Sequence, residues 1–341
     1  MADPIVIRAI SAGTFFRLSG SPAALQGSSA GRLFDRARTL LESNDISGAK
    51  KAFQEMIEEF PCVSSGYAGR GLVNALEGKP EEAEKDFFRA LKKDPDDQQA
   101  MIGLGDLRLM QGRFDEAGVR FKDCLGVNPR NAAAAIGMAE VSEFQGKGDI
   151  DGAVRYYELA RSVAPDIAQE LNEDLCRLLM KKIEDLVKDK HPTLLKQYLD
   201  KVFPFIGMLS DAQKKNLAAA YMKYAVSRAT SASNGNNNGN NECVAYAQTA
   251  LQLSPSYDGI DDVWAVGTLT LRAMDRINSG EFETAEKLLD IAEKLHRNDP
   301  QIRSNIVTAY GFLITAYKPY EAMNLSRVEK YRLAIQRLDP K

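Results

Sequence analysis

Three columns of residues recur at a nearly constant interval in the first half of the chain, and this internal repeat limits the fold more than any other feature. Each repeat ends at a proline, and the prolines are Pro61, Pro95, Pro129 and Pro165, with intervals of 34, 34 and 36 residues. The aromatic column is Phe53, Phe87, Phe121 and Tyr157, and the alanine column is Ala49, Ala83, Ala117 and Ala153. A period of this length indicates an array of similar units that stack on one another.

Each repeat predicts two helices joined by a short turn. The second helix is clearest in PEEAEKDFFRALKKDP, residues 80–95, where Pro80 suits the first helical turn and Pro95 ends the unit. A first helix precedes it in YAGRGLVNALEG, residues 67–78. Gly71 in this helix recurs 34 residues later as Gly105. Small residues facing large ones allow two helices to approach closely, so we expect the alanine and aromatic columns to form the core of each pair.

The order of small residue, alanine, aromatic residue and proline resembles that of the tetratricopeptide repeat (TPR) family. The resemblance covers four repeats in residues 30–165, and repeat four has two extra residues near QGKGDIDGA. It departs from the family pattern where a tyrosine is expected in the first helix: the chain has Leu40, Asn74, Arg108 and Ser142 there. The resemblance implies an all-α fold, a right-handed superhelical solenoid of antiparallel helix pairs.

The rest of the chain divides into two parts. Residues 1–29 form an N-terminal leader or arm, rich in Ser, Gly and Ala, which suits a disordered leader, an organelle transit peptide, or an ordered strand or hook. Residues 166–341 predict a C-terminal helical region of degenerate TPR-like pairs, closed by capping helices at 301–317 and 320–338. Within it, the Asn-rich stretch 231–241 predicts a disordered loop.

The TPR resemblance implies a concave groove lined by the first helix of each repeat, where a partner peptide or helix binds. The corresponding positions, together with Ala68, are Phe34, Arg38, Leu41, Leu72, Ala75, Ile102, Asp106, Leu109, Ile136, Glu140 and Glu143. The early positions are mostly apolar and the last ones are acidic. An apolar or amphipathic peptide fits such a row, although some of these side chains would instead pack on neighbouring repeats. The ligand could also be IVIRAISAGTFF, residues 5–16, folded back or donated by a neighbouring chain.

One known use of such grooves finds little support in these residues. TPR adaptors that bind heat-shock chaperones clamp a C-terminal carboxylate with lysine, arginine and asparagine. The corresponding positions here include Phe34, Arg38, Leu72, Gln99 and Gly103, of which only Arg38 is basic. We therefore expect a partner other than a chaperone C-terminus.

No motif in the sequence carries catalytic chemistry. The chain lacks a phosphate-binding G-x-x-x-x-G-K-[ST] loop and a G-x-S-x-G elbow. Acidic residues such as Glu81, Glu82 and Asp86 are expected on a solvated helix face. The two histidines have no second ligand at metal-binding spacing. We expect no enzyme activity, no cofactor, no metal site and no transmembrane segment.

Charge and cysteine content guide the choice of partner and compartment. The net charge of −3 gives no general signature of nucleic-acid binding, but residues 177–230 carry 11 basic and 5 acidic groups. The four cysteines are far apart, which favours a reducing compartment such as the cytoplasm. Three functions remain: an adaptor that binds a peptide during complex assembly, an organelle assembly or targeting factor imported through residues 1–29, and a regulatory solenoid that contacts RNA or anionic lipid through residues 177–230.

Overall fold

A computed structural model describes residues 25, 27–146, 148–189, 191–231, 238–255, 262–295, 300–319 and 324–340. These residues are helical with short connections and contain no strand, so the all-α prediction is confirmed for them. The chain forms two compact units, residues 1–178 and 179–341, and the boundary lies within one long helix, α10 (Ala168–Asp189). Most of the predicted arm, residues 1–24 and 26, lies outside the described residues.

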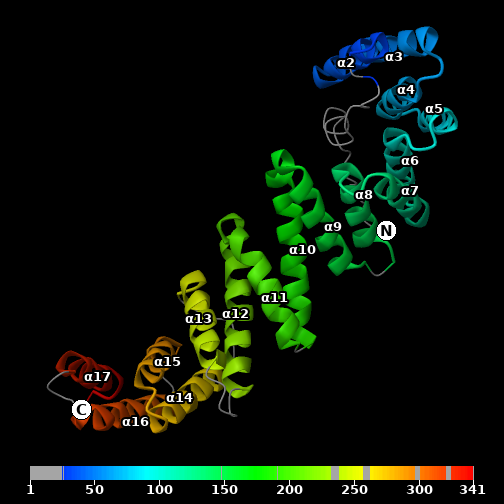
Figure 1. Ribbon diagram of the computed structural model, residues 1–341. Helices are drawn as coiled ribbons and strands as arrows, with labels where there is room; N and C mark the ends of the chain where they lie inside the picture. The colour runs from blue at the N-terminus through cyan, green and yellow to red at the C-terminus, as the bar shows by residue number, and fades with distance from the viewer. Residues whose placement is uncertain are drawn as a thin grey trace. The chain divides into compact units, whose positions relative to one another are not determined.

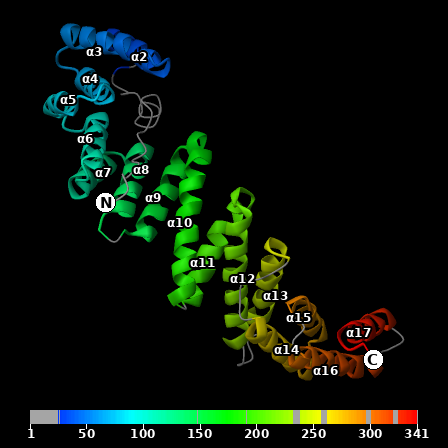
Figure 2. The ribbon, with the colours of Figure 1, turned by 180° about the vertical axis from the view of Figure 1, so that it is seen from behind.

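Unit 1 is built from four helix pairs followed by the start of α10. The helices are α2 (Ser29–Glu42), α3 (Ile46–Glu59), α4 (Ser64–Leu76), α5 (Pro80–Lys93), α6 (Gln98–Met110), α7 (Phe114–Val127), α8 (Ala132–Phe144) and α9 (Ile150–Val163). Each helix packs against the next one in sequence (Figures 1 and 2). The longer fourth connection, residues 145–149, contains the extra residues that the sequence placed in repeat four.

Local sequence signals explain where these helices begin and end. Asp97 and Asn131 cap α6 and α8, because each side chain accepts a hydrogen bond from a backbone N–H three residues on, at 2.9 and 3.0 Å. Gly78 and Gly112 end the turns after the first helices with φ of 72° and 70°, a conformation that favours glycine. Pro80 occupies the first turn of α5.

The aromatic column lies in the core, and the rings of Phe87 and Phe121 each fit between glycines of two first helices. A Cβ atom on Gly71 would lie 2.9 Å from the ring of Phe87, and one on Gly103, in the next repeat, would lie 2.3 Å from it. Gly105 and Gly137 flank Phe121 in the same way. The sequence analysis identified Gly71 and Gly105 as small residues of the pair, but it named Gly103 only as a clamp position and did not name Gly137. Both of these glycines let the next repeat pack closely on the same ring.

Polar pairs occupy the column where the family pattern has a tyrosine. Asn74 and Arg70 of α4 donate hydrogen bonds to Asp86 of α5, at 3.0 Å from Asn74 and at 2.6 and 2.8 Å from Arg70. The hydrogen bond to Asp86 is the main cause of a raised pKa for Arg70. The expectation that Asp86 is a solvated surface residue is therefore wrong: it is 3% exposed and joins the two helices of its repeat. Arg108 of α6 likewise pairs with Glu84 of α5 and Glu116 of α7.

Unit 2 continues with helix pairs of less regular sequence. After α10 come α11 (Pro192–Val202), a 3-10 helix (Phe203–Met208), α12 (Asp211–Ser231), α13 (Asn238–Leu253), α14 (Asp262–Asn278), α15 (Phe282–Leu295), α16 (Pro300–Tyr317) and α17 (Leu325–Leu338). The pairs α12–α13, α14–α15 and α16–α17 pack as helical hairpins. The small residues that marked these degenerate repeats are buried: Cys243, Ala247, Ala250, Ala285 and Ala292.

The predicted loop at 231–241 needs a correction. Helix α12 extends to Ser231 and α13 begins at Asn238, so the backbone of residues 238–241 is helical rather than part of a loop. Asparagine is a favourable residue at a helix N-terminus, which composition alone does not reveal. Residues 232–237 lie outside the described residues.

Candidate peptide-binding groove

The first helices of the second, third and fourth repeats form a row in unit 1. Helix α4 contacts α6, and α6 contacts α8, whereas the second helices α5 and α7 approach each other less closely. The more closely packed row must lie on the inner side of the curve that the pairs follow. We call the surface that α2, α4, α6 and α8 present on this side the inner face. These four helices carry all the groove positions predicted from the sequence.

The apolar positions of the inner face are buried in this structure, not open to solvent. Phe34 is 2% exposed, Leu72 8%, Ile102 0% and Ile136 4%. Leu41, Ala68 and Leu109 are buried as well, and Ala75 is half-buried. This burial agrees with the alternative that some of these side chains pack within the repeats: Phe34 lies against Phe53 of α3, and α6 contacts both α4 and α8. Whether these residues bind a partner stays a prediction.

The polar positions at the two ends of the inner face are paired. In α2, the Arg38 guanidinium lies 3.4 Å from a carboxylate oxygen of Asp35 and 3.9 Å from one of Glu42. Arg38 is therefore shared between two acids of its own helix. Glu140 in α8 is 6% exposed.

Glu143, predicted to make the far end of the groove acidic, is held by an arginine of α10. The Arg177 guanidinium donates two hydrogen bonds to Glu143, one of 3.0 Å from Nη2 to Oε2, and also lies 3.4 Å from Asp174. The hydrogen bond to Glu143 is the largest cause of a raised pKa for Arg177. Sequence reasoning missed this pair, although the 34 residues between its members equal one repeat.

Asp106 is the unusual polar position. It lies in the middle of the inner face on α6, is half-buried, and makes no hydrogen bond or ion pair with any described residue. Desolvation raises the pKa of its carboxyl from 3.8 to about 7. Asp106 can therefore be neutral or charged near neutral pH, and it is available to a hydrogen-bond donor or a cation that enters the inner face.

The basic segment 177–230 is partly balanced by acidic neighbours in the described part of the chain, which pair with five of its eleven basic groups. Besides Arg177, the Lys196 ammonium lies 2.9 Å from Asp200, and the Arg228 guanidinium lies 3.2 Å from Glu242. Lys188 and Lys214 also lie within 4.0 Å of aspartates. These pairs reduce the positive field that would attract a polyanion, but they do not test binding to RNA or anionic lipid.

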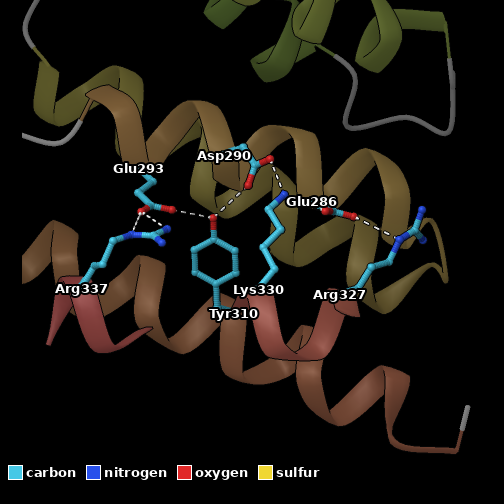
Figure 3. A network of polar contacts seen from close by, with 7 residues as sticks. All are labelled: Glu286, Asp290, Glu293, Tyr310, Arg327, Lys330 and Arg337. Carbon is cyan, nitrogen blue, oxygen red and sulfur yellow. Dashed lines mark hydrogen bonds and ion pairs between the residues drawn. The ribbon is translucent and has the colours of Figure 1, made fainter. Parts of the chain in front are cut away.

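A second polar cluster lies in unit 2, between α15, α16 and α17 (Figure 3). The Lys330 ammonium of α17 donates hydrogen bonds of 2.8 Å to both Glu286 and Asp290 of α15. Arg337 donates to Glu293 at 2.7 Å, and the Tyr310 hydroxyl of α16 donates at 3.0 Å to the same carboxylate. The groups satisfy one another along the length of α17, so this cluster attaches a helix and offers no open site.

The described residues contain no group of three or more His, Cys, Asp or Glu side chains arranged to hold a metal ion. No described helix is both long enough and apolar enough to cross a membrane. All four cysteines are free thiols, and of these only Cys62 is exposed.

Comparison with known proteins agrees with the repeat pattern. Residues 34–91 and 77–121 match the family model described as tetratricopeptide repeat, so this stretch consists of TPR units. A search of curated proteins gives no match.

Several solved structures are similar to parts of the chain. Pseudomonas aeruginosa PilF is 17% identical, and the match covers 67% of this chain and 92% of PilF with a TM-score of 0.41. PilW, described as a widely conserved type IV pilus biogenesis factor, is 17% identical over 67% of this chain and 94% of its own, with a TM-score of 0.42. The TPR domain of P58(IPK) is 17% identical over 85% of this chain and 100% of its own, with a TM-score of 0.28.

Proposed function

We propose that this protein is a non-enzymatic scaffold or adaptor that holds a peptide or helix of a partner protein on the inner face of unit 1 during complex assembly. The observation that carries the proposal is the row of apolar side chains at matching positions of α2, α4, α6 and α8, with Asp106 among them. TPR units in general are modules for binding proteins, and those in residues 34–121 support this reading. The free cysteines suit work in a reducing compartment.

The inner face favours a partner segment that is apolar or amphipathic with a donor or cation near its middle. Ala75 is only half-buried and provides apolar area that a partner can cover, and the Asp106 carboxyl favours a partner group that can donate a hydrogen bond. Arg38 is occupied by Asp35 and Glu42, which argues against its use as a carboxylate clamp. A chaperone C-terminus is therefore a poor fit.

The test is affinity capture from a lysate of the source organism, with mass spectrometry as the readout. Glutamate at Leu72 or Ile102 would bury a charge and disturb the fold, so these positions cannot separate binding from folding. We would instead change Ala75 and Asp106 to arginine, because both are only half-buried. Partners bound to the inner face should be lost from this double variant.

The matched control is Glu82→Arg, which makes the same charge change as Asp106→Arg on the exposed surface of α5. It should recover the same partners as the parent. If the folded inner-face variant recovers them as well, the proposed function is wrong.

A further inference from the structure

A cavity of about 340 Å³ lies between the second helices α7 and α9 of unit 1. Both helices pack on α8, but they approach each other less closely than the first helices α6 and α8 do. The residues of α8 that line the cavity, together with Gln145 just after it, are Met138, Val141 and Ser142, and none of these is an inner-face position. The cavity is therefore separate from the inner face.

The corresponding gap one repeat earlier, between α5 and α7, is bridged by charged side chains. Arg108 of α6 pairs with Glu84 of α5, and its Nε atom lies 3.3 Å from a carboxylate oxygen of Glu116 in α7. The three equivalent residues of the α7–α9 gap, at the intervals of the alanine column, are all small: Gly118, Ser142 and Gly152. The space that Arg108 bridges in one repeat is thus left open in the next.

The middle of the cavity is apolar. Val119 of α7 is 52% exposed, and Met138 and Val141 of α8 lie beneath it in the same lining. An added Cβ atom on Gly118 would meet only Val141, at 3.4 Å, so this glycine leaves room above the floor of the cavity. A partner's apolar side chain that enters here leaves water and covers exposed apolar surface of this chain.

Charges of opposite sign lie at the two ends of the cavity. On α7, Asp115 precedes Gly118 by three residues and Lys122 follows it by four, so each charge lies about one helical turn from the glycine. Asp149 and Arg155, before and within α9, line the cavity in the same order, although they also lie 4.0 Å from each other. The cavity therefore has an acidic end and a basic end.

Groups at both ends can bind a partner. The exposed Lys122 ammonium and the Tyr156 hydroxyl make no hydrogen bond or ion pair with any described residue, so both are available as donors. The Asp115 carboxylate accepts a hydrogen bond from Gln145, and a carboxylate can accept several more.

We infer that this cavity binds an amphipathic α-helix of a partner protein, antiparallel to α7, through one large apolar side chain flanked by an acidic and a basic residue. The apolar side chain enters between Gly118 and Gly152. The acidic residue lies about one turn before it, at Lys122, and the basic residue lies about one turn after it, at Asp115. The site lies outside the groove of the proposed function, so one chain has room for two partner segments.

Two properties of helices carry the choice of occupant. Side chains three or four residues apart lie on one face of a helix, and this spacing matches the one-turn steps from Asp115 to Gly118 and from Gly118 to Lys122. The antiparallel direction places the acidic residue nearer the partner's N-terminus and the basic residue nearer its C-terminus, as the helix dipole favours. An amphipathic helix in a groove is also a recurring mode of peptide recognition.

The test uses a synthetic peptide of about 15 residues, long enough to form a helix. It carries Glu, Phe and Lys at i, i+4 and i+7 among alanine and glutamine, and fluorescence anisotropy follows its binding to the full chain. Gly118→Glu with Ser142→Arg fills the cavity with the residue types of the preceding gap. We expect the filled chain to bind the peptide about tenfold more weakly or less, and a peptide with Ala in place of Phe to bind the parent as weakly.

The matched control makes the same two changes outside the cavity lining, as Gly126→Glu in α7 with Ser162→Arg in α9. It should bind the peptide like the parent, and circular dichroism and urea midpoints compare the folding of both variants.

A charge exchange tests the site without touching the core. Lys122→Glu changes an exposed residue and should weaken binding of the peptide. A second peptide, with Lys in place of its Glu, should bind this variant more tightly than it binds the parent. Failure of this exchange overturns the proposed direction of the helix.

The remaining outcomes separate this site from the inner face. Failure of the peptide to bind the parent, or equal affinity for the parent and the folded filled chain, overturns the assignment. Binding that is lost in the variant with arginine at Ala75 and Asp106 but kept in the filled chain places the peptide on the inner face and overturns it as well. Binding that is lost only in the filled chain supports the site, whatever the fate of the proposed function.

Discussion

At the scale of single residues, the core of unit 1 depends on glycines that sequence periodicity shows only in part. Phe87 and Phe121 each touch a glycine of their own repeat and one of the next. The second contact joins one repeat to the following one, so a substitution there affects the stacking of repeats.

Gly103→Ala should therefore destabilise the protein. The added Cβ would lie 2.3 Å from the Phe87 ring, and relief of such an overlap costs about 1–3 kcal/mol. Gly126→Ala in α7 is the matched control, because nothing lies within 4 Å of its added Cβ. It should stabilise the helix by about 0.5–1 kcal/mol. Urea unfolding of both variants is the measurement, and a stabilising Gly103→Ala would show that the ring and helix are not packed as described.

Asp106 predicts a specific dependence of stability on pH. Its pKa of about 7 in the folded chain exceeds the ordinary value of 3.8, so the folded state binds this proton more tightly than the unfolded chain. The free energy of unfolding therefore falls as pH rises from about 4 to about 7. Above that range Asp106 is charged and its full destabilising effect is present. Asp106→Asn removes the titration, so its stability relative to the parent should increase between pH 4 and 7 and then level off.

Urea midpoints at four pH values between 4 and 8 would measure this difference. Asp96→Asn, in the exposed turn before α6, is the control for a general effect of removing one carboxylate. A difference between Asp106→Asn and the parent that does not change with pH would mean that the carboxyl is not desolvated.

At the scale of helices, the attachment of α17 to α15 is the clearest case of one element held by charged contacts (Figure 3). Burial alone would raise the pKa of Glu286, but the hydrogen bond from Lys330 and the positive charges of Lys330 and Arg327 help to outweigh it, and the pKa is lowered below 4.5. A carboxylate whose pKa is lowered on folding stabilises the folded state when the pH is above the ordinary pKa. This contribution is lost as the pH falls through the lowered pKa of the folded state.

Glu286→Gln should thus lower stability by about 1 kcal/mol at neutral pH, since the Lys330 ammonium is half exposed and partly screened. The difference from the parent should shrink below pH 4.5. Thermal melting at pH 7 and pH 3.5 would measure it. Glu283→Gln on the same helix removes only an exposed pair with Lys287 and should change little at either pH.

At the scale of the whole molecule, each helix pair in a stack is stabilised mainly by its contacts with the neighbouring pairs. Phe87→Ala should cost about 3–5 kcal/mol, the usual range for emptying a buried aromatic site. Because Phe87 contacts α4 and α6, the loss should be concentrated in unit 1.

Hydrogen exchange followed by mass spectrometry can locate this loss. We expect faster exchange in α4–α7 and unchanged exchange in α14–α16 of unit 2. Uniformly faster exchange along the chain would mean that the two units unfold as one cooperative system, contrary to the division at residue 178.

The sequence by itself determined the helix pairs, their turns and the alanine and aromatic columns, because these depend on local signals and on a period that repeats four times. It also determined the small-residue columns of α13 and α15, which have the same spacing. Tertiary structure decided which helix faces are covered. Periodicity places Leu72 and Ile102 on the first helices, but only packing shows that they are buried. The pairs Asp86–Arg70 and Glu143–Arg177 likewise depend on how close neighbouring helices come, since a charge is stable in the interior only where a partner reaches it.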